Sequence, residues 1–146
     1  MANAIANYAK GMFLKGQLAS SDTFKILLMK SGFVFDKDTH QDYADVIASE
    51  VANGLGYTTG GVTLTGAIVS VDTALNVAKL LWDNPVWTAS GGPLVASGAI
   101  IYDDSTLVGS GDDYTDAVIS YIDFGGDVTI TDGLTLKITN AEIILA

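Results

Sequence analysis

Hydrophobic and polar positions alternate with a period of two along most of the chain, which is the pattern of β-strands. In residues 23–30, Phe24, Ile26 and Leu28 face one way, and Leu27 makes the opposite face apolar as well. A strand that is apolar on both faces is buried in the middle of a sheet or at an interface. The segment therefore predicts a central strand.

Further strands are indicated by short apolar runs that glycine, proline, asparagine and aspartate separate. They are expected at residues 62–64, 66–72, 76–82, 86–90, 95–103, 117–124 and 143–145. Short strands at this spacing, with glycine-rich turns between them, are typical of a sandwich or barrel and not of alternating strands and helices. We expect a mainly β fold: an antiparallel β-sandwich or barrel, of the jelly-roll or immunoglobulin-like kind.

The clearest local signal is a hairpin near the C-terminus. Strict alternation runs through residues 128–131 and again through residues 134–138, and Asp132 and Gly133 stand between them. Asp-Gly between alternating runs favours a type I′ turn, which requires positive φ at both central residues. The pattern predicts that these two strands pair with each other.

A helical pattern is found near the N-terminus, in residues 4–15. Apolar residues follow one another there at spacings of three and four: Ile5, Tyr8, Ala9, Met12 and Phe13. This predicts a short amphipathic helix, or an arm that docks on a partner. A helical turn or two is also expected within residues 36–50. We therefore divide one domain, 1–146, into an arm (1–20) and a β domain (21–146).

Composition limits the chemistry that the chain can perform. It has no cysteine, no arginine and one histidine, with seven lysines against seventeen acidic residues, for a net charge of −10. Zinc, haem and iron–sulfur sites need Cys and His ligands, and nucleic acids or anionic membranes need clustered basic residues. We expect no cofactor, no enzymatic activity, and no nucleic-acid or membrane partner. The N-terminus shows no targeting segment, which predicts synthesis in the cytoplasm.

Two acidic segments are candidates for calcium binding or acid–base chemistry. One is residues 36–42, where His40 stands among alternating acids, and the other is residues 103–116, which hold five aspartates. Calcium requires six or more oxygen ligands, and a glycosidase requires a carboxylate pair beside a cleft. Alternating charge is also what a solvated loop shows. The solvated loop is the favoured interpretation of both segments, with calcium binding left open.

Three aromatic residues are candidates for sugar stacking. Trp82 and Trp87 flank Asp83-Asn84-Pro85, and Tyr57 follows a glycine. Exposed aromatic rings could hold a carbohydrate, whereas buried tryptophan anchors a core or an interface. The core interpretation is favoured, and a carbohydrate-binding module remains the alternative.

The chain resembles a widespread family of small structural proteins of tailed bacteriophages. The similarity runs from about residue 8 to residue 138. It is carried by Asp38-Thr-His40, Asp45-Val46, Glu50-Val51, Gly54-Leu-Gly-Tyr-Thr-Thr-Gly-Gly61, Thr63-Leu64, Asp72, Asn76-Val77-Ala-Lys79, Val86-Trp87, Ala99-Ile-Ile-Tyr102 and Tyr121-Ile-Asp-Phe-Gly125. The chain departs from typical members in lacking arginine and in its longer acidic loop at 103–116. The resemblance implies a β-rich component of the virion, and it brings no catalytic residues.

A compact β domain of this length suits a capsid decoration, or cement, protein better than a shell or fibre protein. Such a protein binds the major capsid protein as an oligomer over junctions of the shell, and a homotrimer is favoured here. A neck, tail or head-fibre component and a carbohydrate-binding virion module are the alternatives. The residues expected at a partner interface are Ile5, Tyr8, Met12, Phe13, Tyr57 and Trp87.

Overall fold

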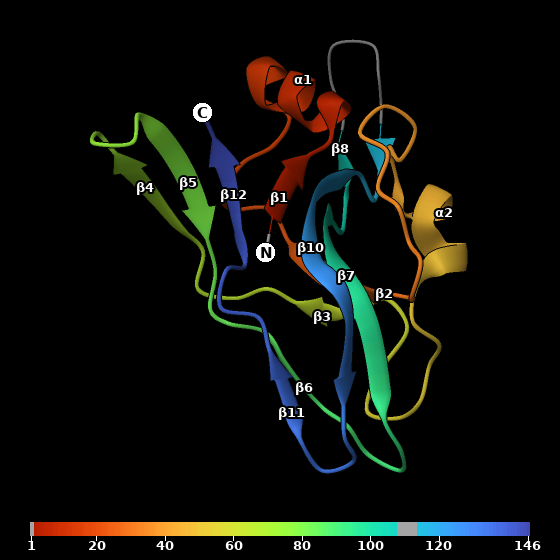
Figure 1. The fold of residues 1–146 in the computed structure, drawn as a ribbon. Helices are drawn as coiled ribbons and strands as arrows, with labels where there is room; N and C mark the ends of the chain where they lie inside the picture. The colour runs from red at the N-terminus through yellow and green to blue at the C-terminus, as the bar shows by residue number, and fades with distance from the viewer. Residues whose placement is uncertain (1, 108–113) are drawn as a thin grey trace.

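The computed structural model describes residues 2–107 and 114–146, and they form a single β-rich domain with antiparallel sheets in a sandwich-like arrangement (Figure 1). This confirms the predicted fold class. The elements are, in chain order, β1 (Ala2–Ile5), α1 (Asn7–Lys15), β2 (Phe24–Met29), α2 (Tyr43–Val46), the 3₁₀ turn η1 (Ile47–Ser49), β3 (Val62–Thr63), β4 (Ile68–Asp72), β5 (Val77–Leu81), β6 (Val86–Thr88), β7 (Leu94–Asp103), β8 (Thr106–Leu107), β9 (Tyr114–Thr115), β10 (Val118–Ile130), β11 (Thr135–Lys137) and β12 (Glu142–Leu145).

The central sheet has the strand order β1-β10-β7-β2-β3, and every pair in it is antiparallel. Strand β2 lies between β7 and β3, with Ile26 opposite Ile101 and Leu27 opposite Ile100. All four of these side chains are fully buried, so β2 is covered on both faces. The prediction of a central strand from its two apolar faces is confirmed.

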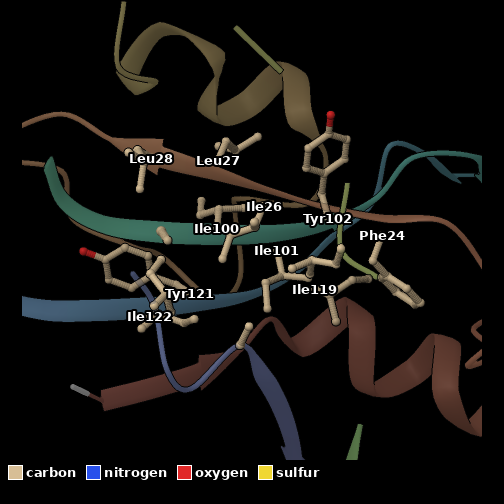
Figure 2. Close-up of a cluster of buried hydrophobic side chains, with 14 of the residues drawn as sticks. Phe24, Ile26, Leu27, Leu28, Ile100, Ile101, Tyr102, Ile119, Tyr121 and Ile122 are labelled. Carbon is tan, nitrogen blue, oxygen red and sulfur yellow. The ribbon is translucent and has the colours of Figure 1, made fainter. Parts of the chain in front are cut away.

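Different elements cover the two faces of this sheet (Figure 2). Leu27 and Tyr102 point toward the side of α2, whereas Ile101 and Ile119 point toward α1. From α1, Ala9 and Met12 are buried in the same core. The sheet is thus covered on both faces around β2 and β7, where most side chains are buried.

A smaller sheet of order β12-β5-β4 stands beside the central one (Figure 1). Strands β5 and β12 contribute Leu80 and Ile143 to the core, and these two residues lie opposite each other. Strand β4 lies at the outer edge, where Ile68, Val69 and Val71 are exposed. A third, two-stranded sheet pairs β11 with β6.

The predicted N-terminal helix is present, but it is shorter than residues 4–15. Residues Ala2–Ile5 form strand β1 on the edge of the central sheet, with Ile5 opposite Ser120, and the helix begins at Asn7. It ends at Lys15, and Gly16 caps it with a φ of 71°, so that the amides of Gly16 and Gln17 bond back to carbonyls of the last turn. Pairing with β10 satisfies the backbone of residues 2–5, which explains why the apolar spacing was misleading there.

The predicted C-terminal hairpin is wrong. Residues 128–130 pair with β7, where Ile130 lies opposite Leu94, and β11 pairs with β6 instead. Of the two turn residues, only Gly133 has positive φ, at 81°. A type I′ turn needs positive φ at both positions, and other turns splay the flanking strands apart. The Asp132-Gly133 turn therefore passes the chain from one sheet to another.

Candidate functional site

An apolar groove lies between the N-terminal arm and the C-terminal strand. It has a volume of about 510 Å³, and its apolar walls come from β1, α1 and β12: Ile5, Phe13, Leu14, Ile144 and Leu145. Leu14 is the most open of these, with 91% of its surface exposed. We call these five residues the arm surface. Lys10 and Lys37 lie at its rim.

A second hollow, of about 170 Å³, continues the arm surface onto the outer sheet. Phe13 and Leu145 line both hollows, and the second adds Val69, Ala78 and Leu80 from β4 and β5. Val69, Ala78, Leu80 and Leu145 lie on one face of the sheet, since they occupy paired positions in neighbouring strands. The apolar surface is therefore continuous from α1 to the outer edge of β4.

The charge of the arm differs in sign from that of the rest of the chain. Residues 1–21 contain Lys10 and Lys15 and no acidic residue, so their charge is +2. The remaining residues carry a charge of −12, which gives the chain its net charge of −10. An apolar surface with a basic rim favours a protein partner whose facing surface is apolar and acidic.

Ile5, Phe13 and Tyr8, three of the residues expected at an interface, lie where a partner could reach them. Ile5 and Phe13 line the arm surface. Tyr8 is 39% exposed on a different side of α1, where it packs against Tyr114 with ring centroids 6.0 Å apart. The structure thus brings two of the three together.

Met12, Tyr57 and Trp87 were wrongly expected at an interface, because the core of the chain itself buries them. Their exposed fractions are 1%, 2% and 3%. Trp82, at 7%, packs its ring against Phe24 with centroids 5.0 Å apart. With Trp82, Trp87 and Tyr57 inside the core, none of the three offers a ring face for sugar stacking. Aromatic residues stabilise cores as readily as interfaces, and the sequence does not separate the two.

Glu50 is a buried carboxylate that ties a glycine-rich loop to the central sheet. One oxygen accepts hydrogen bonds from the Tyr57 hydroxyl and the Gly60 amide, both at 2.6 Å, and the other accepts one from the Tyr43 hydroxyl. Tyr102 stacks on Tyr43 at 5.2 Å and donates to the Gly60 carbonyl at 3.0 Å. Each part of this network is paired, as a buried charge requires.

The tyrosines of this network are poor acids. Burial raises the pKa of Tyr57 and Tyr43, and the bond that each donates to Glu50 raises it further. Burial also raises the pKa of Tyr102. These hydroxyls therefore stay protonated as hydrogen-bond donors, those of Tyr43 and Tyr57 to the Glu50 carboxylate and that of Tyr102 to the Gly60 carbonyl.

Asp103 is the second buried carboxylate, at the end of β7. It accepts a hydrogen bond from the Ser105 hydroxyl and is fully buried. Burial raises its pKa to about 6, although the bond from Ser105 lowers it, and the carboxylates of Asp22 and Asp104 raise it. Asp104 itself pairs with Lys25 at 3.0 Å. Asp112 and Asp113, from the same acidic segment, lie outside the described residues.

The acidic segment at 36–42 is a hydrogen-bonded turn. Asp36 accepts the amides of Asp38 at 2.8 Å and Thr39 at 3.2 Å, and these bonds hold the pKa of Asp36 below its usual value. Asp42 caps helix α2 by accepting the Asp45 amide. Among residues 2–107 and 114–146, no three acidic or histidine side chains are grouped so that they could hold a metal ion.

Sequence reasoning missed several highly exposed apolar residues. They are Leu14 on α1, and Ile68, Val69, Val71 and Leu75 on β4 and the turn after it, all between 61% and 91% exposed. The strand at 66–72 was expected, but its alternation does not say whether another element covers it. The signal available was the low number of charges in residues 62–71.

Comparison with protein families, with curated proteins and with solved structures finds no match for this chain. None of the helices in the described parts of the chain has the length and apolar character needed to cross a membrane.

Proposed function

We propose that this protein is a structural component of a bacteriophage virion, and that it acts as a capsid decoration protein. The observation that carries the proposal is the continuous apolar surface that runs from the arm to β4. Leu14, Val69 and Leu145 on this surface are exposed in the isolated chain, and they would gain from contact with another protein.

Binding to an assembled shell would stabilise the particle by mass action, without chemistry. In this proposal the arm surface contacts the major capsid protein at a junction between shell subunits. Lys10 and Lys37 at its rim would favour acidic residues on the shell. The remainder of the chain is strongly acidic, which favours solubility. The protein would bind as an oligomer, with a trimer the expected form.

The first test is the composition of purified virions from the phage that encodes the chain. Mass spectrometry with a copy-number estimate should find the protein in hundreds of copies per particle, as a layer over a shell requires. A dozen copies or fewer would remove the decoration role and favour a neck or tail position. Absence from the particle would remove the proposal as a whole.

A second test compares two leucines of high exposure. Leu14 lies in the arm surface and is 91% exposed, whereas Leu134 follows the Asp132-Gly133 turn and is 60% exposed. Leu14→Asp should weaken co-sedimentation with shells tenfold or more, because it places a charge in the contact. Leu134→Asp should leave binding unchanged. Equal effects of the two variants would contradict the assignment of the contact to the arm.

A further inference from the structure

Strand β4 presents an unprotected sheet edge. It is the last strand in the order β12-β5-β4, and its outer side has no partner strand among the described residues. Exposed edges are usually guarded by lysine, proline, a bulge or a covering loop. In β4 the only charged residue is Asp72, and its carboxylate is engaged by the amides of Ala74 and Leu75, each at 3.0 Å.

The two edges of this sheet are treated differently. At the β12 edge, Asn3 of β1 reaches across and donates its side-chain amide to the Glu142 carbonyl at 3.1 Å. At the β4 edge, Ile68, Val69 and Val71 are 63%, 61% and 71% exposed, and Leu75 in the following turn is 65% exposed. We call these four residues the β4 patch.

We propose that the β4 edge is a two-fold contact between two copies of this chain. An antiparallel pair centred on Ser70 sets Val69 of each copy opposite Val71 of the other. The sequence Val69-Ser70-Val71 reads the same in both directions, so both valine pairs fall on one face. The two outer sheets would become one sheet of six strands, and each free backbone group along the edge would gain a partner.

Charge and area favour a second copy as the occupant. Asp72 is the only charged residue of β4, and in this register it lies opposite the apolar Ile68, so no two like charges face each other across the strand pair. The β4 patch amounts to on the order of 400 Å² per copy, the size of the largest apolar patches on monomeric proteins, which are often functional. Two patches with their paired backbones approach the roughly 1,000 Å² at which contacts become specific.

This contact adds a partner to the proposed function, and it depends on that function only for where it would be used. A two-fold contact joins copies in pairs. On a shell it would therefore link one oligomer of the protein to the next. The contact itself is a property of the isolated chain and is tested without a virion.

The chain has no cysteine, so a single introduced thiol reports on the contact. Ser70→Cys places the two thiols opposite each other, within the range of Cα separations that a disulfide spans. Under mild oxidation it should give a covalent dimer at least tenfold faster than Ala52→Cys, an exposed control. Equal rates for the two variants would overturn the proposal.

Light scattering with size-exclusion chromatography gives an independent readout. Val71→Lys should lower the mass of the associated species, whereas Val34→Lys, at 79% exposure outside the patch, should not change it. A strictly monomeric wild-type chain, or association that survives Val71→Lys, would overturn the proposal. Neither result would bear on whether virions contain the protein, so this inference and the proposed function can fail separately.

Discussion

The central sheet and the outer sheet (β12-β5-β4) have the same kind of alternating sequence, but they are covered to different degrees. Around β2 and β7 the central sheet is covered on both faces, and we call it closed; the outer sheet is exposed at β4, and we call it open. Residues of β2 and β7 have layers on both sides, whereas β4 has solvent along its edge and over Val69 and Val71. In a closed sheet the apolar side chains are buried, and their burial stabilises the fold. In an open sheet the apolar side chains stay exposed, and a partner can bury them. The comparison predicts that matched substitutions in the two sheets will affect stability and association in opposite ways.

The largest effect on stability is expected at Gly61, which joins the glycine-rich loop to the central sheet. A Cβ at Gly61 would stand 2.0 Å from the backbone oxygen of Ile26, at a φ of +72°. Backbone cannot move aside without breaking the pairing of β2 with β3. Gly61→Ala should therefore cost more than about 4 kcal/mol or prevent folding.

Gly32→Ala is the matched control for this prediction, because Gly32 has a φ of +79° and nothing within 4 Å of the added Cβ. It should cost only about 1 kcal/mol, which is the conformational term alone. Urea unfolding measures both variants. Similar losses of unfolding free energy in the two variants would show that close contact between Gly61 and the backbone of β2 is not the reason for the glycine at this position.

Truncating isoleucine in each sheet makes the comparison direct. Ile101 is fully buried in β7, and Ile68 is 63% exposed in β4. Ile101→Ala should lower the free energy of unfolding by about 3–4 kcal/mol through lost transfer energy and the cavity left behind. Ile68→Ala should lower it by less than about 1 kcal/mol, measured at concentrations low enough to suppress association. A large loss at Ile68 in the monomer would mean that β4 belongs to the closed core.

Removing the charge of Glu50 tests how the loop is held on the central sheet. Glu50→Gln keeps the shape of the side chain but turns one acceptor oxygen into a donor that faces another donor. We expect a loss of about 2–3 kcal/mol in urea unfolding. Glu142→Gln is the control, because the half-buried Glu142 carboxylate makes a long ion pair with Lys79, at 3.8 Å. That variant should cost less than about 1 kcal/mol.

The sequence predicted those parts of the fold that local pattern determines. The two apolar faces of residues 23–30 require burial wherever the strand lies, and β2 is buried. Pairing partners depend on competition between distant strands, and for this reason Asp132-Gly133 misled: residues 128–130 had a longer partner available in β7. The exposure of Val71 could not be predicted either, because the alternating pattern of its strand is the same as that of a core strand.

The candidate site was predictable in its location but not in its full membership. The apolar spacing of the arm pointed to Ile5 and Phe13, which do line the arm surface. Leu14 breaks that spacing and was overlooked, although it is the most exposed residue there. Trp87 and Tyr57 are large aromatics that suit a core and an interface equally, so only the three-dimensional packing assigns them to the core.

The smallest effect is expected at Asp103, where the closed sheet buries an acid. Its folded-state pKa is raised to about 6 from a usual value of 3.8, so the folded state favours the protonated form. The stability from this group is fully present below pH about 4 and is lost as the pH rises through about 6. Asp103→Asn keeps a neutral side chain at every pH, and should stabilise the protein by about 1–2 kcal/mol at pH 7.

Because seventeen acids titrate in the same range, the quantity to measure is the difference between the variant and the wild type. Unfolding in urea should show that Asp103→Asn and wild type have similar stabilities at pH 4 and diverge as the pH rises to 7. A constant difference between Asp103→Asn and wild type across this range would mean that the carboxyl of Asp103 stays ionised in the folded chain. The covered sheet would then tolerate a charge that its packing otherwise excludes.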